Sequence, residues 1–225
     1  MERVLEPEWL DTLPADDPRA IRSRADLRRL NWLMNNASTI ARVLQEVPSA
    51  RRILDVGAGD GAFALRLAGK LQGRATEFVL ADRIGDLPPR VREGFKSLNC
   101  AVQFQRCDAL AGLAEIGPVD VAFVNLFLHH FQEAEIKQLL GDLSSRCQVF
   151  IACEPRRSSF ALLASRAVGL IGCNDVTRHD AVVSVRAGFS AGELSALWPT
   201  PDRWELIEKP AGWFSHCFIA KRLGL

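Results

Sequence analysis

The chain has 225 residues, 48% of them hydrophobic, which is enough to bury the core of one α/β domain. Its formal net charge is +1 at pH 7, so it lacks the basic excess of a phosphate-binding protein, and nucleic acid is not expected as the main substrate. The six cysteines form no C-x-x-C pair and have no histidine at metal-ligand spacing, which predicts reduced structural thiols and no metal site. The acidic N-terminus does not resemble a signal peptide and no apolar run is long enough to span a bilayer. We therefore expect a cytoplasmic protein without a transmembrane segment, and the composition leaves its oligomeric state open.

The first fifty residues predict a helical cap over one edge of a sheet. Residues 1–20 are rich in proline and acid and are expected to be irregular, whereas residues 21–47 carry an apolar stripe at helical spacing that Pro48 ends. Trp32, Asn35 and Asn36 lie within this stretch. We interpret the asparagine pair as a helix interruption, the alternative being that these side chains face a ligand cleft.

Short apolar runs then alternate with helical stretches. Strands are predicted at residues 52–56, 77–82, 102–108, 119–125 and 148–154, and helices at 62–68, 87–98 and 133–145. Such alternation means right-handed crossovers and a parallel sheet covered on both faces. Two final strands, 204–207 and 213–220, form a hairpin. The pattern predicts a Rossmann-like, doubly wound α/β fold with a mostly parallel seven-stranded sheet and an antiparallel last strand.

Residues 156–200 interrupt this alternation and form an insert before strand six. Phe160–Ile171 is apolar almost all round, and we favour a buried crossover helix over one wall of an acceptor pocket. Asn174–Asp180 is expected to be a polar turn, and Ser190 to cap a short helix through Leu197. The predicted organisation is a single domain, 1–225, with a helical cap (1–49), a cofactor-binding core (50–155), an acceptor-side insert (156–200) and a closing hairpin (201–225).

A glycine turn follows the first strand. Gly57, Gly59 and Gly61 alternate with Ala58 and Asp60, directly before a helix-compatible segment. Glycines adopt positive φ and leave no Cβ between the backbone and a ligand, and a helix N-terminus presents free amides to a carboxylate or phosphate. A glycine turn by itself is also compatible with dinucleotide binding or with a plain tight connection.

Polar side chains end four consecutive predicted strands: Asp55, Asp82, Asp108 and Asn125. Each acid alone could cap the following helix, but ligands of open parallel sheets bind beyond the carboxyl ends of the strands. The set therefore indicates one shared ligand site. Asp82 is placed to accept the hydroxyls of a ribose, and Asp108 an exocyclic amine of adenine.

The segment Leu54–Gly61 resembles motif I of class I S-adenosylmethionine-dependent methyltransferases, and Asp82 and Asp108 stand where that family has its ribose and adenine acids. Asn125–Phe131 is similar to the segment after strand four in ubiquinone/menaquinone-type and other small-molecule members. The resemblance implies S-adenosyl-L-methionine as cofactor, with Asp55 near its ammonium group. It implies the following cofactor-binding residues: Asp55, Gly57, Ala58, Gly59, Gly61, Asp82, Arg83, Asp108, Ala109, Asn125 and Leu126. The alternative cofactor is NAD, whose looser fingerprint the glycines also satisfy.

Fewer residues of the sequence bear on the methyl acceptor than on the cofactor. Asn125 does not begin the Asn/Asp-Pro-Pro-aromatic motif of many amine and nucleobase methyltransferases, which favours oxygen or carbon acceptors. The stretch from Thr177 to Arg186 also resembles methyltransferases that accompany type III polyketide synthases. The predicted function is methylation of a small apolar acceptor, phenolic or polyketide-like, with O-methylation favoured over C-methylation. The alternatives are an RNA or protein methyltransferase and a non-catalytic binding protein.

Because tyrosine is absent, histidines are the candidates for a catalytic base. His129 and His130 follow strand four, where a supporting role is the alternative. His179 lies between Arg178 and Asp180, and the neighbouring carboxylate is placed to orient it, the alternative being an exposed loop histidine. His216, in the last strand, is expected to be structural.

Overall fold

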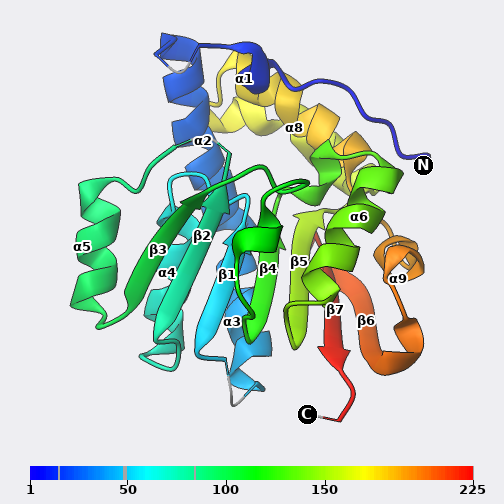
Figure 1. Cartoon of the computed structure of the whole chain (residues 1–225). Helices are drawn as coiled ribbons and strands as arrows, with labels where there is room; N and C mark the ends of the chain where they lie inside the picture. Colours follow the sequence, from blue (N-terminus) through cyan, green and yellow to red (C-terminus); the bar gives the residue numbers. More distant parts are fainter. Residues whose placement is uncertain (15, 48–49, 84, 225) are drawn as a thin grey trace.

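The computed structural model describes residues 1–14, 16–47, 50–83 and 85–224. Its seven-stranded sheet has the order β3-β2-β1-β4-β5-β7-β6 (Figure 1). The strands are β1 (Arg52–Val56), β2 (Glu77–Asp82), β3 (Ala101–Arg106), β4 (Val121–Asn125), β5 (Val149–Pro155), β6 (Trp204–Ala211) and β7 (Ser215–Arg222). The first five pair in parallel, and β7 runs antiparallel to both β5 and β6. The predicted fold class is confirmed.

Helices cover both faces of the sheet. The α-helices are α1 (Trp9–Thr12), α2 (Pro18–Met34), α3 (Asn36–Gln45), α4 (Ala62–Leu71), α5 (Pro89–Ser97), α6 (Glu133–Ser144), α7 (Ser159–Arg166), α8 (Asp175–Ala187) and α9 (Glu193–Leu197). The 3-10 helices are η1 (Leu113–Glu115), η2 (Leu128–His130), η3 (Val168–Ile171) and η4 (Pro201–Arg203). No helix in the described ranges is long and apolar enough to cross a membrane.

Two apolar clusters lie on opposite faces of the sheet because successive strand residues point in opposite directions. Ile53 packs with residues of α3, α4 and α5, whereas the adjacent Leu54 packs with those of α6 and α9. All six cysteines are free and five are buried, as expected for structural thiols. The carboxyl ends of the five parallel strands meet at one edge, above which Figure 1 shows α1 and α8.

The predicted helical stretch at residues 21–47 forms two helices, α2 and α3. Asn35 has φ of 56°, its amide donates to the carbonyl of Trp32, and α3 begins at Asn36, so the asparagine pair does interrupt the helix. An asparagine tolerates this left-handed conformation better than most residues. The expected stop at Pro48 lies outside the described residues.

The structure corrects three expectations for residues 156–200. Phe160, Leu163, Leu170 and Ile171 are exposed, so the buried-helix interpretation of Phe160–Ile171 is wrong; its buried face consists of small side chains, Ala161 and Ser165. Asn174 starts no polar turn. It is the N-cap of α8, accepting from the amide of Thr177, while the buried Asp26 accepts from the Asn174 amide.

Ser190 is not the N-cap of α9. That helix begins at Glu193 after Gly192, and the Ser190 amide instead donates to the Glu193 carboxylate. The N-cap of α9 is therefore Gly192, which has the left-handed backbone conformation.

Residues 1–12 form a strap along α8, which we call the N-terminal strap (Figure 1). The amide of Val4 donates to the carbonyl of Arg186, and the Arg3 guanidinium donates to the carbonyls of Ala187 and Phe131. Asp180 accepts from the first amides of α1. These bonds hold the strap beside the segment that follows β4.

Candidate functional site

The turn between β1 and α4 has the predicted glycine conformation. Gly57, Gly59 and Gly61 have φ of 77°, 56° and 73°, and the amides of Gly57 and Ala58 both donate to the carbonyl of Ala81 in β2. A Cβ on Gly57 would lie 2.3 Å from the ring of Phe127, closer than carbon atoms can approach. The turn therefore needs glycine both for its backbone conformation and for its close contact with the segment after β4.

Asp55 is the most unusual charged group of the site. It is 2% exposed at the end of β1, and its Oδ2 has no hydrogen-bond partner among the described residues. Burial and the nearby Asp82 raise the pKa of Asp55 well above its usual range. A buried carboxylate without a partner is costly, and a cationic or N–H-donating ligand would relieve that cost.

Asp82 and Asp108 lie at the ends of neighbouring strands. Oδ2 of Asp82 accepts from the amide of Gly59 at 2.8 Å, so this carboxylate also supports the glycine turn. Asp108 is exposed, and its Oδ1 accepts from the amide of Leu110 at 2.8 Å. A carboxylate has about four lone-pair sites, so neither of these bonds by itself prevents the side chain from accepting from a ligand.

Asn125 ends β4 and connects the strand edge to the helical cap. Its Oδ1 accepts from Nδ2 of Asn36 at 2.8 Å, and its Nδ2 donates to Oδ1 of Asn31 at 3.3 Å. Asn36 is fully buried and accepts in turn from Ser215. Sequence reasoning missed Asn31, which lies one helical turn before Asn35.

The remaining predicted cofactor residues lie at the same edge. Leu126 has a positive φ of 54°, and its amide donates to the carbonyl of Cys153. Arg83 follows β2 and is exposed, and Ala109, half-buried, packs on the apolar cluster under α6. The structure thus brings the predicted cofactor-binding residues to the carboxyl ends of β1 to β4.

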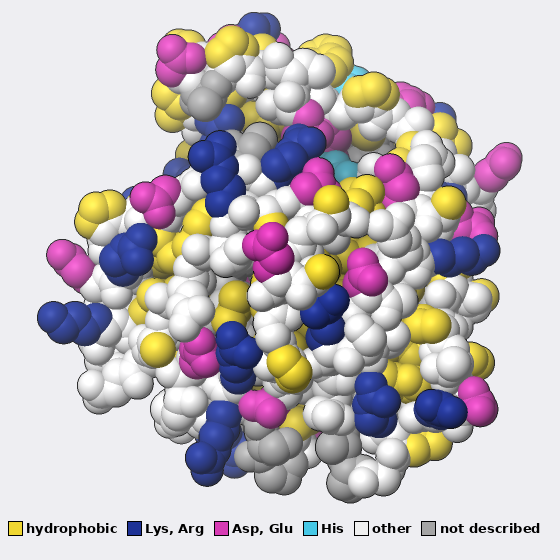
Figure 2. All heavy atoms as spheres, in the orientation of Figure 1, with side chains coloured by type: hydrophobic (Ala, Val, Ile, Leu, Met, Phe, Trp, Pro, Cys, Tyr) yellow, Lys and Arg dark blue, Asp and Glu magenta, His cyan; other side chains and the backbone are white. Residues whose placement is uncertain are grey.

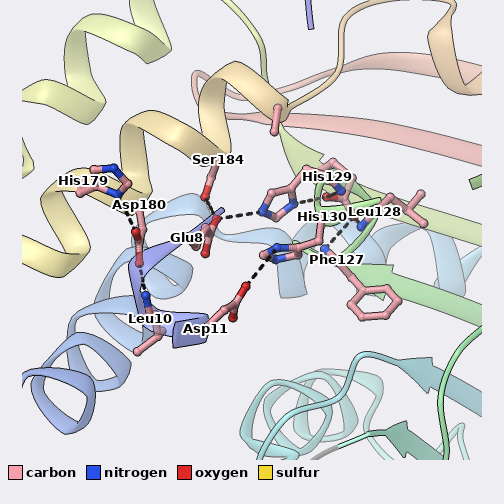
Figure 3. A network of polar contacts seen from close by, with 12 residues as sticks. Glu8, Leu10, Asp11, Phe127, Leu128, His129, His130, His179, Asp180 and Ser184 are labelled. Carbon is pink, nitrogen blue, oxygen red and sulfur yellow. Dashed lines mark hydrogen bonds and ion pairs between the residues drawn. The ribbon is translucent and has the colours of Figure 1, made fainter. Parts of the chain in front are cut away.

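His129 lies in a buried charge network that joins three separate parts of the chain (Figure 3). Its Nδ1 is 2.8 Å from the fully buried Glu154 at the end of β5, and its Nε2 is 3.6 Å from Glu8 of the N-terminal strap. Glu154 also accepts from the amides of Phe127 and Leu128. Burial by itself lowers the pKa of His129, but the two carboxylates raise it to about 9.

Sequence reasoning missed the roles of both glutamates. Glu154 carried a usable signal, since an acid ends a predicted buried strand there; Glu8 lies in an irregular segment and carried none. Glu8 accepts from the hydroxyl of Ser184 in α8, which holds its carboxylate toward His129.

His130 is adjacent but in a different electrostatic environment. Its Nδ1 is 3.9 Å from Asp11, and its side chain is about one-third exposed. Burial, followed by the charge of His129, lowers the pKa of His130. Both imidazoles point from η2 toward the strap (Figure 3). They line a cavity of about 100 Å³ together with Glu8, Asp11 and Val183.

His179 lies apart from this pair. Its Nδ1 is 2.9 Å from Oδ1 of Asp180, as the adjacent residues suggested, and its ring stacks on Trp9 with 4.0 Å between centroids. His179 lies in α8, so it is not a loop histidine. His216 is buried in β7 and bonded to Glu208 at 2.7 Å.

Glu8, His129 and His130 place one possible ligand atom each within 4.8 Å of the others, which is close enough to hold a metal ion. In the absence of a metal ion, the pKa of His129 at about 9 keeps its imidazole protonated at neutral pH. This imidazolium pairs with Glu8 and with Glu154, which lies outside the cluster, and a metal ion would have to displace its proton.

Figure 2 shows the molecule hollowed between the part that carries α1 and the strand ends below it, with side chains of both charges around the hollow. A glycine turn and acids at the ends of adjacent parallel strands, in a sheet of order 3-2-1-4-5-7-6, define the class I methyltransferase fold. Residues 53–148 match the family described as methyltransferase domain. The matched segment is less than half of the chain and includes all of β1 but its first residue, the glycine turn, and β2 to β4.

Two solved structures share the fold over most of the chain. The plantazolicin methyltransferase BpumL in complex with SAH has a TM-score of 0.66 at 16% identity, over 92% of this chain and 91% of that one. The magnesium protoporphyrin IX methyltransferase of Synechocystis PCC 6803, with bound SAH, has a TM-score of 0.58 at 12% identity, over 84% and 83%.

A protein-L-isoaspartate O-methyltransferase of Stenotrophomonas maltophilia is 31% identical over 107 residues. The match spans 47% of this chain and 44% of the relative, so the chain spans less than half the length of the curated relatives that it matches.

Proposed function

We propose that the chain, as one domain over residues 1–225, transfers the methyl group of S-adenosyl-L-methionine to an oxygen of a small apolar acceptor, phenolic or polyketide-like. The observation that carries the cofactor is the buried Asp55, whose Oδ2 lacks a partner among the described residues at the end of β1. The positively charged ammonium group of the cofactor supplies the partner that the Asp55 carboxylate lacks. Asp82 accepts the ribose hydroxyls and Asp108 the adenine amine, and the glycine turn allows close approach.

The comparisons support this cofactor. The matched family is a methyltransferase domain, and both structural neighbours described above were solved with SAH, the product that S-adenosylmethionine leaves. The name of the curated relative refers to O-methylation, which agrees with an oxygen acceptor.

Transfer is an in-line displacement, so the protein must align acceptor and methyl group and remove one proton. We propose His130 as the base that removes this proton from the acceptor. Its lowered pKa leaves its imidazole neutral at pH 7, and it lines the cavity beside the N-terminal strap. His129, with a pKa of about 9, is a cation whose ion pairs hold the segment after β4 in position. His179, oriented by Asp180, is the second candidate base.

Titration calorimetry with S-adenosylmethionine, its homocysteine product and NAD tests the cofactor. Binding of the first two in the micromolar range is expected. Binding of NAD alone would overturn the proposal.

Methyl transfer to a panel of phenols, followed by mass spectrometry, tests the acceptor class. We expect His130→Gln to lower kcat with unchanged cofactor affinity, and His179→Gln to do so if His179 is the base instead. Cofactor binding without any product would favour a non-catalytic binding protein. Steeply salt-dependent binding of RNA would favour an RNA methyltransferase.

A further inference from the structure

One face of α2 is exposed and combines apolar with basic side chains. Ile21, Arg28, Trp32 and Leu33 are exposed at helical spacing, and the side chain of Trp32 belongs to neither apolar cluster of the described residues. Trp32 is 69% exposed, although residues of this kind are usually buried or paired with a partner. The opposite side of α2 carries the buried Ser23 and Asp26, which bond to α8.

The 3-10 helix η3 extends this face. Leu170 is 89% exposed and Ile171 is 50% exposed, and the guanidinium of Arg29 contacts the carbonyl of Ile171. Between the two elements lies a groove of about 500 Å³. It is lined by Ala25, Arg28, Arg29, Trp32, Leu33 and Ile171. We call these six residues together with Ile21, Arg22 and Leu170 the α2 face.

The charge of α2 is strongly one-sided. The helix contains five arginines but only one acid, Asp26, which is buried and paired with Arg29. The N-cap Asp17 pairs with Arg19, and the exposed Arg22 and Arg28 belong to the α2 face. The whole chain has a formal net charge of +1, so this helix concentrates positive charge that the rest of the chain offsets. Arginines beside exposed tryptophan and leucine side chains combine positive charge, which attracts anionic lipids, with apolar groups that can enter the acyl boundary.

We propose that the α2 face docks on an anionic phospholipid surface, with Trp32, Leu33 and Leu170 in the acyl boundary and Arg22 and Arg28 against lipid phosphates. A second copy of the chain is a poorer occupant, because a two-fold contact would bring the same arginines against each other. This binding does not require the proposed function, since the α2 face includes none of the residues assigned to cofactor or proton transfer.

Co-sedimentation of the full chain with vesicles tests the inference. We expect binding to vesicles that contain phosphatidylglycerol, a loss of binding at high salt, and little binding to pure phosphatidylcholine. Arg28→Glu should lower the partition coefficient by about fivefold or more, which corresponds to about 1 kcal/mol per basic residue at the surface. Trp32→Ser should lower it by roughly tenfold through lost apolar burial.

Matched controls keep the test specific. Trp213 is an equally exposed tryptophan on the β6–β7 connection, at 68%, so Trp213→Ser should leave vesicle binding unchanged. Lys96→Glu, at an exposed position of α5, is the corresponding charge control. Thermal unfolding of each variant shows that it folds, and cofactor titration of the same samples separates this inference from the proposed function.

Three outcomes would overturn the proposal. Absence of binding to anionic vesicles does so directly, as does binding that Trp32→Ser and Trp213→Ser lower equally. Self-association in light scattering that Trp32→Ser abolishes, without vesicle binding, would assign the α2 face to a second copy of the chain.

Discussion

Replacing Asp55 by asparagine separates the stability of this fold from its ligand binding. Asp55 is 2% exposed, and the nearby charge that affects its pKa is the like charge of Asp82. Its raised pKa means that the folded protein binds a proton more tightly than the unfolded chain does. The carboxyl group therefore favours folding below its unfolded pKa, and that contribution is lost as pH rises through the folded pKa.

At neutral pH the asparagine variant should be more stable than the parent. The buried carboxyl group is hard to ionise, at a cost of about 1.4 kcal/mol per unit of raised pKa, whereas an amide of the same shape does not ionise. A gain of about 2 kcal/mol corresponds to an increase in Tm of roughly 4–8 °C for a chain of this length. The amide cannot pair with the ammonium group of the cofactor, so affinity should fall by about 10- to 100-fold, as expected for a lost hydrogen bond to a charged group.

Differential scanning fluorimetry between pH 5 and pH 9 and calorimetry with the homocysteine product measure the two effects. The stability gain should grow as pH rises, because the parent loses its proton while the variant has none to lose. Asp60→Asn, at a half-buried position of the same turn, is the control for an acid that is not fully buried. A variant that is less stable than the parent and binds the product equally well would refute both the burial argument and the ammonium assignment.

Three further predictions concern the same edge of the sheet. Gly57→Ala, whose Cβ would lie 2.3 Å from the ring of Phe127 at a φ of 77°, should lower Tm and weaken cofactor binding, by fluorimetry and calorimetry, whereas Gly59→Ala has free space for its Cβ and should be milder. Asp82→Ala should lower cofactor affinity by about tenfold or more, since it removes a charged acceptor and the bond to the Gly59 amide; unchanged affinity would remove the ribose assignment. Because the pKa of His129 is raised to about 9, its stabilising contribution is present below pH 6.5 and lost as pH rises through 9; urea titrations should show up to about 3 kcal/mol less stability at pH 9.5 than at pH 6.5, and Glu8→Gln should flatten that profile.

Elements with local signals were predictable from the sequence. Short apolar runs predicted the strands, and glycine spacing predicted the turn, because backbone conformation there depends on the residue present. Since parallel strands carry their carboxyl ends to one edge, the positions of Asp55, Asp82, Asp108 and Asn125 along the chain were enough to place these side chains together. Local signals failed at Asn174, where a polar run that suggested a turn is the cap of α8.

Contacts between residues far apart in the chain could not be predicted from the sequence. Glu8 lies far from His129 and Glu154 along the chain, and no periodicity relates the three; the strap places Glu8 against His129 because α8 and the segment around η2 accept its hydrogen bonds. The same holds for the apolar run Phe160–Ile171, whose composition predicts burial but whose large side chains face outward. Burial depends on what packs against an element, and that is a property of the assembled chain, not of the segment.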